Sequence, residues 1–161
     1  MSKKKNVAAL VGFLVLSLAA GAIGGFWTAP ATAPGGWYYQ IEKPSWTPPS
    51  WLFGPVWTAL YIAMGVAAWL VWRRGGWAAQ RGPLTLWLVQ LFLNTIWSGL
   101  FFGLRSPALG AIEIVFLWIA ILLTILAFRR VSPAAAGLMV PYLLWVSFAA
   151  ALTFAVWRLN T

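Results

Sequence analysis

Two amides and four tryptophans lie inside apolar stretches of the chain, and these side chains are the first candidates for chemistry. One helix face carries, at positions i, i+4, i+7 and i+11, the side chains of Gln90, Asn94, Trp97 and Phe101. A face with two amides avoids lipid, so we expect it to point into protein. Asn94 there either bonds to a neighbouring helix or contacts a ligand, and the spacing fits both roles.

The tryptophans inside these stretches are residues of the type that holds flat apolar molecules: Trp57, Trp97, Trp118 and Trp145. Trp57 and Tyr61 lie one turn apart on the same helix face. Ala149 lies one turn beyond Trp145, where its small side chain leaves room. Aromatic faces with a few amide and phenol groups are the usual lining of a pocket for an apolar ligand. Dense aromatic packing between helices, without a ligand, is the alternative.

The chain has no cysteine and no histidine, which excludes a thiol nucleophile, a histidine base and the commonest metal ligand. Its two carboxylates, Glu42 and Glu113, are too few for a two-carboxylate hydrolase or a dinuclear metal site. We therefore expect no metal and no cofactor. Glu113 is expected to be shallow in the membrane, where it reaches the interface or pairs with Arg105, rather than to act as a proton relay.

Most of the chain must lie in lipid, because 62% of its 161 residues are hydrophobic and only 8% are charged, with a mean hydropathy of +0.83. Soluble proteins average about 25% charged residues. The net charge of +9 is typical either of nucleic-acid binding or of the flanks of membrane spans. The basic residues stand beside apolar runs, so we assign them to membrane topology and expect no nucleic-acid partner.

Five apolar runs are long enough to cross a bilayer. They predict an all-α integral membrane protein, a five-transmembrane-helix bundle in which residues 1–161 form a single domain. The first run follows three lysines and precedes Ala31-Thr32-Ala33, which also fits a signal peptide. Because the apolar run is long for a signal peptide, we favour a retained helix. Short connections predict that consecutive helices from the second to the fifth are antiparallel neighbours. The expected helices cover residues 7–28, 51–72, 83–104, 107–128 and 133–157.

The loop at residues 29–50 differs from a solvated linker, because proline, glycine and aromatic residues dominate it. Pro44, Pro48 and Pro49 fix their own φ angles and bias the preceding residues away from helix, so this part is expected to be stiff. Tryptophan and tyrosine favour the membrane surface. We therefore expect the loop to lie across the helix bundle as the lid of a pocket.

Lysine and arginine are unevenly divided between the two ends of the five predicted helices. One end has three of them: Lys43, Arg105 and Arg158. The N-terminal end has eight: Lys3, Lys4, Lys5, Arg73, Arg74, Arg81, Arg129 and Arg130. Because cytoplasmic loops collect basic residues, this division predicts a cytoplasmic N-terminus, with the C-terminus and the loop at residues 29–50 on the outer side.

Several ordered motifs resemble those of a known family. They are Lys43-Pro44-Ser45-Trp46-Thr47-Pro48-Pro49-Ser50-Trp51, Phe53-Gly54-Pro55-Val56-Trp57 with Tyr61, Gln90 with Asn94-Thr95-Ile96-Trp97, Phe101-Phe102-Gly103, and Pro141-Tyr142-Leu143-Leu144-Trp145. Over nearly the whole chain they resemble the tryptophan-rich sensory protein and translocator protein family, also called the peripheral benzodiazepine receptor (TspO/MBR) family. The resemblance implies a five-helix bundle, a homodimer, and a pocket under the first loop. The ligand-binding residues that it implies are Trp46, Trp57, Tyr61, Asn94, Trp97, Trp145 and Ala149.

The same resemblance implies a membrane receptor, sensor or transport protein that binds porphyrins, such as protoporphyrin IX, and related flat apolar ligands. Some bacterial members are reported to degrade protoporphyrin in light, which would make Trp57 and Trp145 catalytic. A structural membrane subunit without a ligand is the second alternative. Since histidine and cysteine are absent, we expect metal-free porphyrin to be preferred, with propionates near Lys43, Arg105 or Arg158. The family's sterol pattern needs a tyrosine that residues 152–158 lack, so sterol binding is not assigned.

Overall fold

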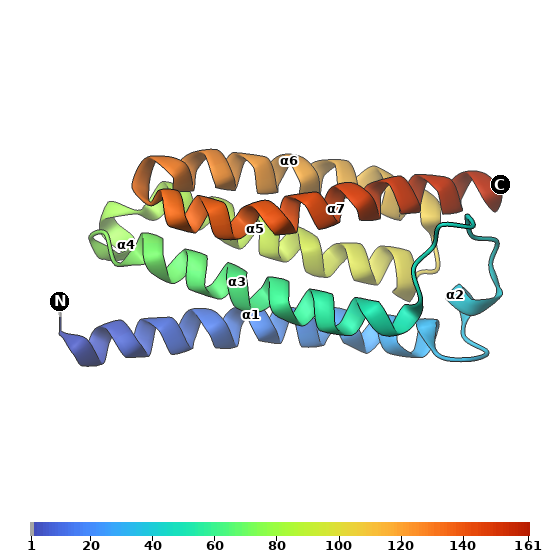
Figure 1. The fold of residues 1–161 in the computed structure, drawn as a ribbon, viewed down its shortest axis with the longest axis horizontal. Coiled ribbons are helices and arrows are strands. Elements are labelled where there is room, and N and C mark those ends of the chain that lie inside the picture. Colours follow the sequence, from blue (N-terminus) through green and yellow to red (C-terminus); the bar gives the residue numbers. More distant parts are fainter. Residues whose placement is uncertain (1) are drawn as a thin grey trace.

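The computed structural model describes residues 2–161, in which five long helices form an antiparallel bundle and no strand occurs (Figure 1). Each of these five helices is long and apolar enough to cross a membrane. This confirms the predicted all-α membrane bundle. The long helices are α1 (Lys3–Thr32), α3 (Phe53–Trp72), α5 (Arg81–Ser98), α6 (Pro107–Val131) and α7 (Pro133–Leu159).

The long helices begin and end close to the expected residues, because capping side chains and prolines mark their ends. Ser106 and Ser132 accept hydrogen bonds from the amides of Leu109 and Ala135, and a proline follows each serine at the first helical position. α1 is longer than expected at both ends and includes Pro30. It packs into the bundle, where the Ser17 hydroxyl donates a 2.7 Å hydrogen bond to the carbonyl oxygen of Tyr61.

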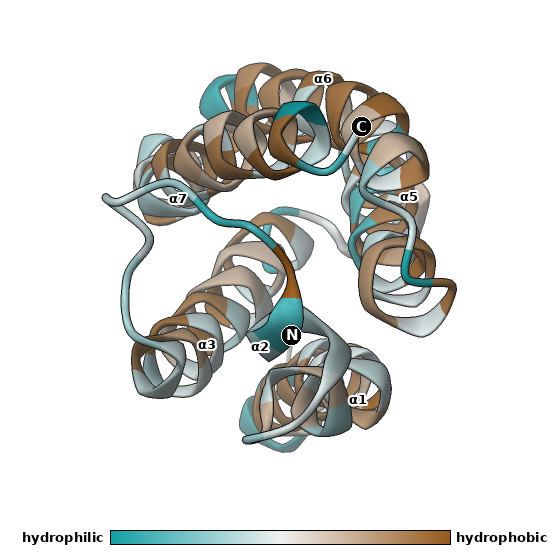
Figure 2. Cartoon of the chain, turned by 90° about the vertical axis from the view of Figure 1, so that its right-hand side faces the viewer, coloured by the Kyte–Doolittle hydropathy of each residue, from teal (hydrophilic) through white to brown (hydrophobic). Residues whose placement is uncertain are grey.

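The order of the helices around the bundle differs from the expectation. Seen end-on, the ring runs α1, α3, α7, α6, α5 and back to α1 (Figure 2). α5, α6 and α7 are neighbours in sequence order, as predicted, but α3 packs chiefly on α1 and α7 rather than on α5. The prediction for this pair was wrong because α1 packs on both α3 and α5, and the eight-residue connection at residues 73–80 is long enough to join two helices that are not close neighbours. Gly75 and Gly76, both with positive φ, turn the chain within this connection.

Four short helical segments differ from the expectation. Two, α2 (Trp37–Gln40) and α4 (Gly76–Ala79), lie in expected connections and are too short to show a helical period. The other two, η1 (Ser50–Leu52) and the π-helical turn η2 (Gly99–Gly103), which extends α5, overlap expected helices but are not α-helical. In η2 the amide of Leu104 bonds to the carbonyl oxygen of Gly99 at 2.8 Å. A π-turn inserts one residue into the helix and so rotates the residues after the insertion around the helix axis. Phe101 and Phe102 are both buried beside this turn.

Candidate functional site

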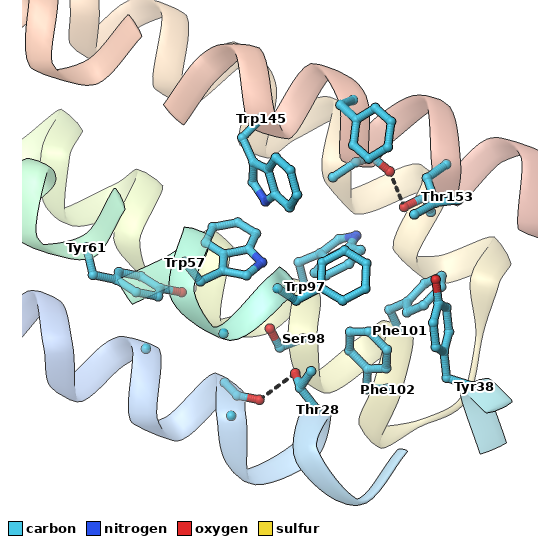
Figure 3. A pocket seen from close by; sticks show the side chains of 18 residues that line it. Thr28, Tyr38, Trp57, Tyr61, Trp97, Ser98, Phe101, Phe102, Trp145 and Thr153 are labelled. Carbon is cyan, nitrogen blue, oxygen red and sulfur yellow. Dashed lines mark hydrogen bonds between the residues drawn. The ribbon is translucent and has the colours of Figure 1, made fainter. Parts of the chain in front are cut away.

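A cavity of about 120 Å³ lies inside the bundle (Figure 3). It is at the end of the bundle where α2 and the loop at residues 41–49 lie (Figure 1). Side chains from α1, α2, α3, the α5–η2 segment and α7 line it, and within residues 2–161 α6 contributes none. The lining residues are Gly21, Gly24, Gly25, Thr28, Tyr38, Phe53, Gly54, Trp57, Tyr61, Trp97, Ser98, Phe101, Phe102, Trp145, Phe148, Ala149, Leu152 and Thr153. We call this cavity the aromatic pocket.

Three indole rings from three different helices form the centre of the aromatic pocket (Figure 3). Trp57 stacks on Tyr61, with ring centroids 5.7 Å apart, and meets Trp145 edge-on at 6.4 Å. Trp97 stacks on Phe101 at 5.1 Å with an angle of 12° between the ring planes. These flat faces suit a flat apolar molecule, because stacking and apolar contact need no particular substituent.

The wall that α1 provides has almost no side chains. Gly21, Gly24 and Gly25 line the aromatic pocket there, and a Cβ atom at Gly21 would lie only 2.6 Å from atoms of the Tyr61 ring. A Cβ at Gly24 would lie 3.1 Å from the Ser98 hydroxyl oxygen. Helices approach closely where glycine removes the side chain. α1 therefore presents bare backbone to the pocket and lets Tyr61 lie flat against it.

The roof of the aromatic pocket is the Tyr38 side chain from the short helix α2. Its ring meets Phe53 at 6.5 Å and Phe102 at 5.6 Å, and only 3% of the residue is exposed. The hydroxyl is buried with no hydrogen-bond partner, and burial raises the pKa of Tyr38 to about 12. The phenol is therefore neutral at physiological pH.

Two polar side chains hold the loop that carries Tyr38 in place. Lys43 donates from Nζ to the carbonyl oxygens of Tyr38 at 2.7 Å and Ile41 at 3.0 Å, and its ammonium lies 5.0 Å from the centre of the Tyr38 ring. Asn160, at the end of α7, accepts a bond from the amide of Glu42 and donates one to its carbonyl oxygen, at 3.1 and 2.9 Å. Lys43, expected near ligand propionates, thus donates to the loop's own backbone instead.

A buried hydrogen-bond chain lies behind the pocket wall. The Tyr61 hydroxyl donates to Asn94 Oδ1 at 2.6 Å, and Asn94 Nδ2 donates to the Tyr142 hydroxyl at 2.7 Å. The chain therefore joins α3, α5 and α7 through one amide. Of the two roles considered for Asn94, the structure shows the bond between helices, and Asn94 is absent from the pocket lining.

The free hydrogen-bond donors of the pocket region are few. Thr28 and Thr153 already donate to the carbonyl oxygens of Gly24 and Ala149 in their own helices (Figure 3). The indole N–H groups of Trp97 and Trp145 are buried without an acceptor, like the hydroxyl of Tyr38. Leaving such a donor unbonded is unfavourable by about 1–3 kcal/mol. An apolar ligand with a neutral or anionic oxygen could therefore gain hydrogen bonds here.

Comparison with known proteins identifies the family to which this helix bundle belongs. The TspO/MBR family model matches residues 13–158. The chain belongs to the TspO/MBR family. It is 47% identical to the tryptophan-rich protein TspO of Chlorobaculum tepidum, over 97% of this chain and 98% of that one. It is 42% identical to the translocator protein of Homo sapiens, over 77% and 75%, and 36% identical to the tryptophan-rich sensory protein of Cereibacter sphaeroides, over 82% and 85%. Family membership and five apolar helices identify a multi-pass integral membrane protein.

Five of the seven residues implied by the TspO/MBR resemblance line the aromatic pocket together: Trp57, Tyr61, Trp97, Trp145 and Ala149. Asn94 stands behind Tyr61. Trp46 stands outside, 49% exposed, where its ring packs on Phe148 at 5.7 Å.

Sequence reasoning missed other parts of the lining. Phe148, Leu152 and Thr153 continue the helix face of Trp145 and Ala149 at helical spacing, so their pattern contained the signal. Tyr38 gave no such signal, because it lies in the short helix α2, whose position depends on bonds made by Lys43 and Asn160.

The expectation for Glu113 was wrong. Its side chain neither reaches the membrane interface nor pairs with Arg105: the residue is 8% exposed, and both carboxyl oxygens are buried without a hydrogen-bond partner. α6 begins at Pro107, so Glu113 lies nearly two turns inside the helix, on its buried face with Gly110 and Leu117. Arg105 precedes the helix in an exposed turn with φ of 54°.

Proposed function

We propose that this TspO/MBR protein binds porphyrins, protoporphyrin IX among them, and related flat apolar ligands in the aromatic pocket, as a membrane receptor, sensor or transport protein. The observation that carries the proposal is the meeting of Trp57, Trp97 and Trp145 around one cavity, opposite a wall of glycine backbone. The names of the relatives, a sensory protein and a translocator protein, agree with a role in sensing or transport.

The pocket favours a porphyrin without a metal. The side chains that line it include neither histidine nor cysteine, and Met64 and Met139 are fully buried outside it. An iron porphyrin would therefore find only phenol, hydroxyl and indole groups, which are poor partners in this neutral environment. The ring would be held by stacking, and its polar edge by the indole N–H groups of Trp97 and Trp145.

Binding requires the roof to move. Pockets for drug-sized ligands usually enclose roughly 300–1,000 Å³, whereas the aromatic pocket encloses about 120 Å³. The Tyr38 ring closes the aromatic pocket against Phe53, and the loop after Tyr38 is held by Asn160. We propose that residues 33–50 lift from the bundle when a porphyrin enters.

A titration of the protein in detergent with protoporphyrin IX tests this function. Saturable quenching of tryptophan fluorescence is expected, weakened at least tenfold in Trp97→Ala and unchanged in Trp118→Phe, because Trp118 bonds to Ser147 outside the pocket. Haem should bind more weakly than the free base. Linear, unsaturable quenching that is the same in all variants would support a structural membrane subunit without a ligand.

The contact between Trp57 and Trp145 favours light-dependent porphyrin degradation as the second candidate function. A porphyrin in the pocket would lie against both indoles, which are the most easily oxidised side chains there. Illumination of the complex in air, with dioxygen as the co-reactant, should then remove the porphyrin absorbance. Trp57→Phe or Trp145→Phe should stop that loss while binding persists. Equal loss in wild type, both variants and protein-free porphyrin would leave only the binding function.

The orientation and the oligomeric state complete the proposal. We place the N-terminus in the cytoplasm, supported by the eight basic residues at that end of the helices, and we propose a homodimer, as the family resemblance implies. Cysteine labelling of Ser2→Cys and Thr161→Cys in intact cells, with a membrane-impermeant reagent, should modify only Thr161→Cys. Mass measurement in detergent distinguishes the dimer from the monomer.

A further inference from the structure

One end of the bundle is strongly basic and has no carboxylate. The N-terminus of α1, the α3–α5 connection and the α6–α7 turn meet there, opposite the aromatic pocket (Figure 1). The chain's two carboxylates are elsewhere. Glu42 lies in the loop beside Asn160, and Glu113 is 17 residues before Arg130, about 25 Å along α6. We call this the basic end, and its residues are Lys3, Lys4, Lys5, Arg73, Arg74, Arg81, Arg129 and Arg130.

A groove between α5 and α6 opens at the basic end. Two arginines line it, Arg81 from the start of α5 and Arg130 from the last turn of α6. The rest of its lining is apolar or small: Gly82, Pro83, Thr85, Leu86, Ala127 and Val131. The groove has about 770 Å³ of open space and faces outward from the helices, where lipid surrounds a membrane bundle. Two cations thus stand at the head of an apolar channel between two spans.

The two groove arginines differ from Arg73, which lies at the same end. Arg73 lies over the Trp69 ring, 4.8 Å from its centre, which gives that guanidinium a protein partner. Arg81 and Arg130 are exposed and, since both carboxylates are remote, neither has an anionic partner in the protein. Two cations that line one groove repel each other, and an anion bound between them would relieve that repulsion. Their place in one groove therefore suits an external anion.

We infer that this groove binds one anionic phospholipid, with its phosphate between Arg81 and Arg130 and an acyl chain along the apolar wall. Guanidinium groups bind phosphate oxygens through two parallel hydrogen bonds, so the pair can grip a phosphate from both sides. Basic pockets between spans are known to take anionic lipid headgroups. A nucleotide or an acidic peptide matches the charge but leaves the apolar wall beside Leu86 and Val131 exposed.

The test measures lipid retention by wild type and two doubly substituted variants with equal loss of charge. Arg81→Gln/Arg130→Gln removes the groove cations, and Arg73→Gln/Arg74→Gln removes two others at the same end. Each protein is incorporated into vesicles of equal phosphatidylglycerol and phosphatidylcholine, extracted in mild detergent, and analysed by mass spectrometry under native conditions. We expect wild type and the Arg73/Arg74 variant to retain phosphatidylglycerol about tenfold over phosphatidylcholine, and the groove variant to lose that preference.

Two further variants separate charge from shape. Arg81→Lys/Arg130→Lys keeps the charge but not the forked geometry, so an intermediate preference is expected. Leu86→Trp fills the groove with all cations intact and should also abolish retention, which covers the case in which the groove double variant does not fold. Equal losses in both glutamine variants, or no preference in wild type, would overturn the site and leave a diffuse attraction to anionic membranes.

Discussion

The hydroxyl of Tyr61 on α3 donates a 2.6 Å hydrogen bond to the side-chain oxygen of Asn94 on α5, although these two helices otherwise make little contact. The same amide donates to Tyr142 on α7. A single buried side chain therefore fixes the positions of two rings, one of which is stacked under Trp57 in the aromatic pocket.

Replacing Asn94 should destabilise the fold and weaken ligand binding, because Asn94 holds the Tyr61 ring in the pocket wall. Asn94→Leu leaves two buried hydroxyl groups unbonded, which we expect to lower the free energy of unfolding by about 1–3 kcal/mol and to weaken porphyrin binding severalfold. Denaturation in mixed detergent, with and without protoporphyrin IX, measures both effects. In a double-mutant cycle with Tyr61→Phe, the second change should cost less in the Asn94→Leu background. Strictly additive losses would show that this bond contributes nothing.

The glycine wall of α1 should not tolerate a side chain at Gly21. A Cβ there meets the Tyr61 ring at 2.6 Å, so Gly21→Ala should displace that ring and lower porphyrin affinity about tenfold. Gly12→Ala on the same helix is the control, because nothing lies within 4 Å of its added Cβ and affinity should stay unchanged. Equal affinities in the two variants would place the ligand away from this wall.

The two hydrogen bonds between Asn160 and Glu42 should control how fast a ligand enters the aromatic pocket. Asn160→Ala removes two hydrogen bonds to Glu42, together worth about 1–2 kcal/mol, so the loop should open more often. Association and dissociation rates measured by stopped-flow quenching should both rise about fivefold, with little change in equilibrium affinity. Thr161→Ala removes a bond only to the carbonyl oxygen of Arg158, three residues earlier, and should leave both rates as in wild type. Unchanged rates in Asn160→Ala would mean that the ligand does not enter under this loop.

Alkaline pH should open the aromatic pocket by ionising the Tyr38 phenol. Burial raises its pKa to about 12 from the ordinary value of 10.0, so the folded protein favours the neutral phenol. That stabilisation is fully present below pH 10 and is lost as the pH rises through 12. Porphyrin release rates should therefore be constant up to about pH 9.5 and increase above it. Tyr38→Phe should remove this component of the pH dependence, and an identical profile in that variant would assign it to other groups.

The buried carboxyl of Glu113 should be replaceable by an amide. Both of its oxygens lack a partner, so Glu113→Gln breaks no hydrogen bond or ion pair, and the neutral amide has nearly the same size as the carboxyl group. We expect the melting temperature in detergent to stay the same or rise by a few degrees, with porphyrin binding retained. A clear fall in either quantity would show that the carboxyl has a specific role.

The sequence predicted the helices well because their ends carry strong local signals. Ser106-Pro107 and Ser132-Pro133 define helix starts whatever the rest of the chain does, and the apolar runs exceed a bilayer's thickness. The sharing of one pocket by Trp57, Trp97 and Trp145 came from the family resemblance, whereas helical spacing only placed each ring inside a span.

The features that could not be predicted depend on contacts distant in sequence. α3 packs on α7 and on α1, and α1 also packs on α5; Gly65 on α3 lets the backbone of Leu14 on α1 come close. The place of Tyr38 results from bonds made by Lys43 and by Asn160, more than a hundred residues away in the latter case. The exclusion of Asn94 from the pocket needed the positions of both tyrosines.

The ring order of the helices has a consequence for biosynthesis. Of the five long helices α7 is synthesised after the other four, and it supplies Trp145, Phe148 and Ala149 as well as, at its end, Asn160, whose side chain bonds to the loop. During synthesis α3 therefore lacks its neighbour on one side until α7 has been made. A nascent chain without α7 lacks one wall of the aromatic pocket, so the lining is assembled only after α7 has packed.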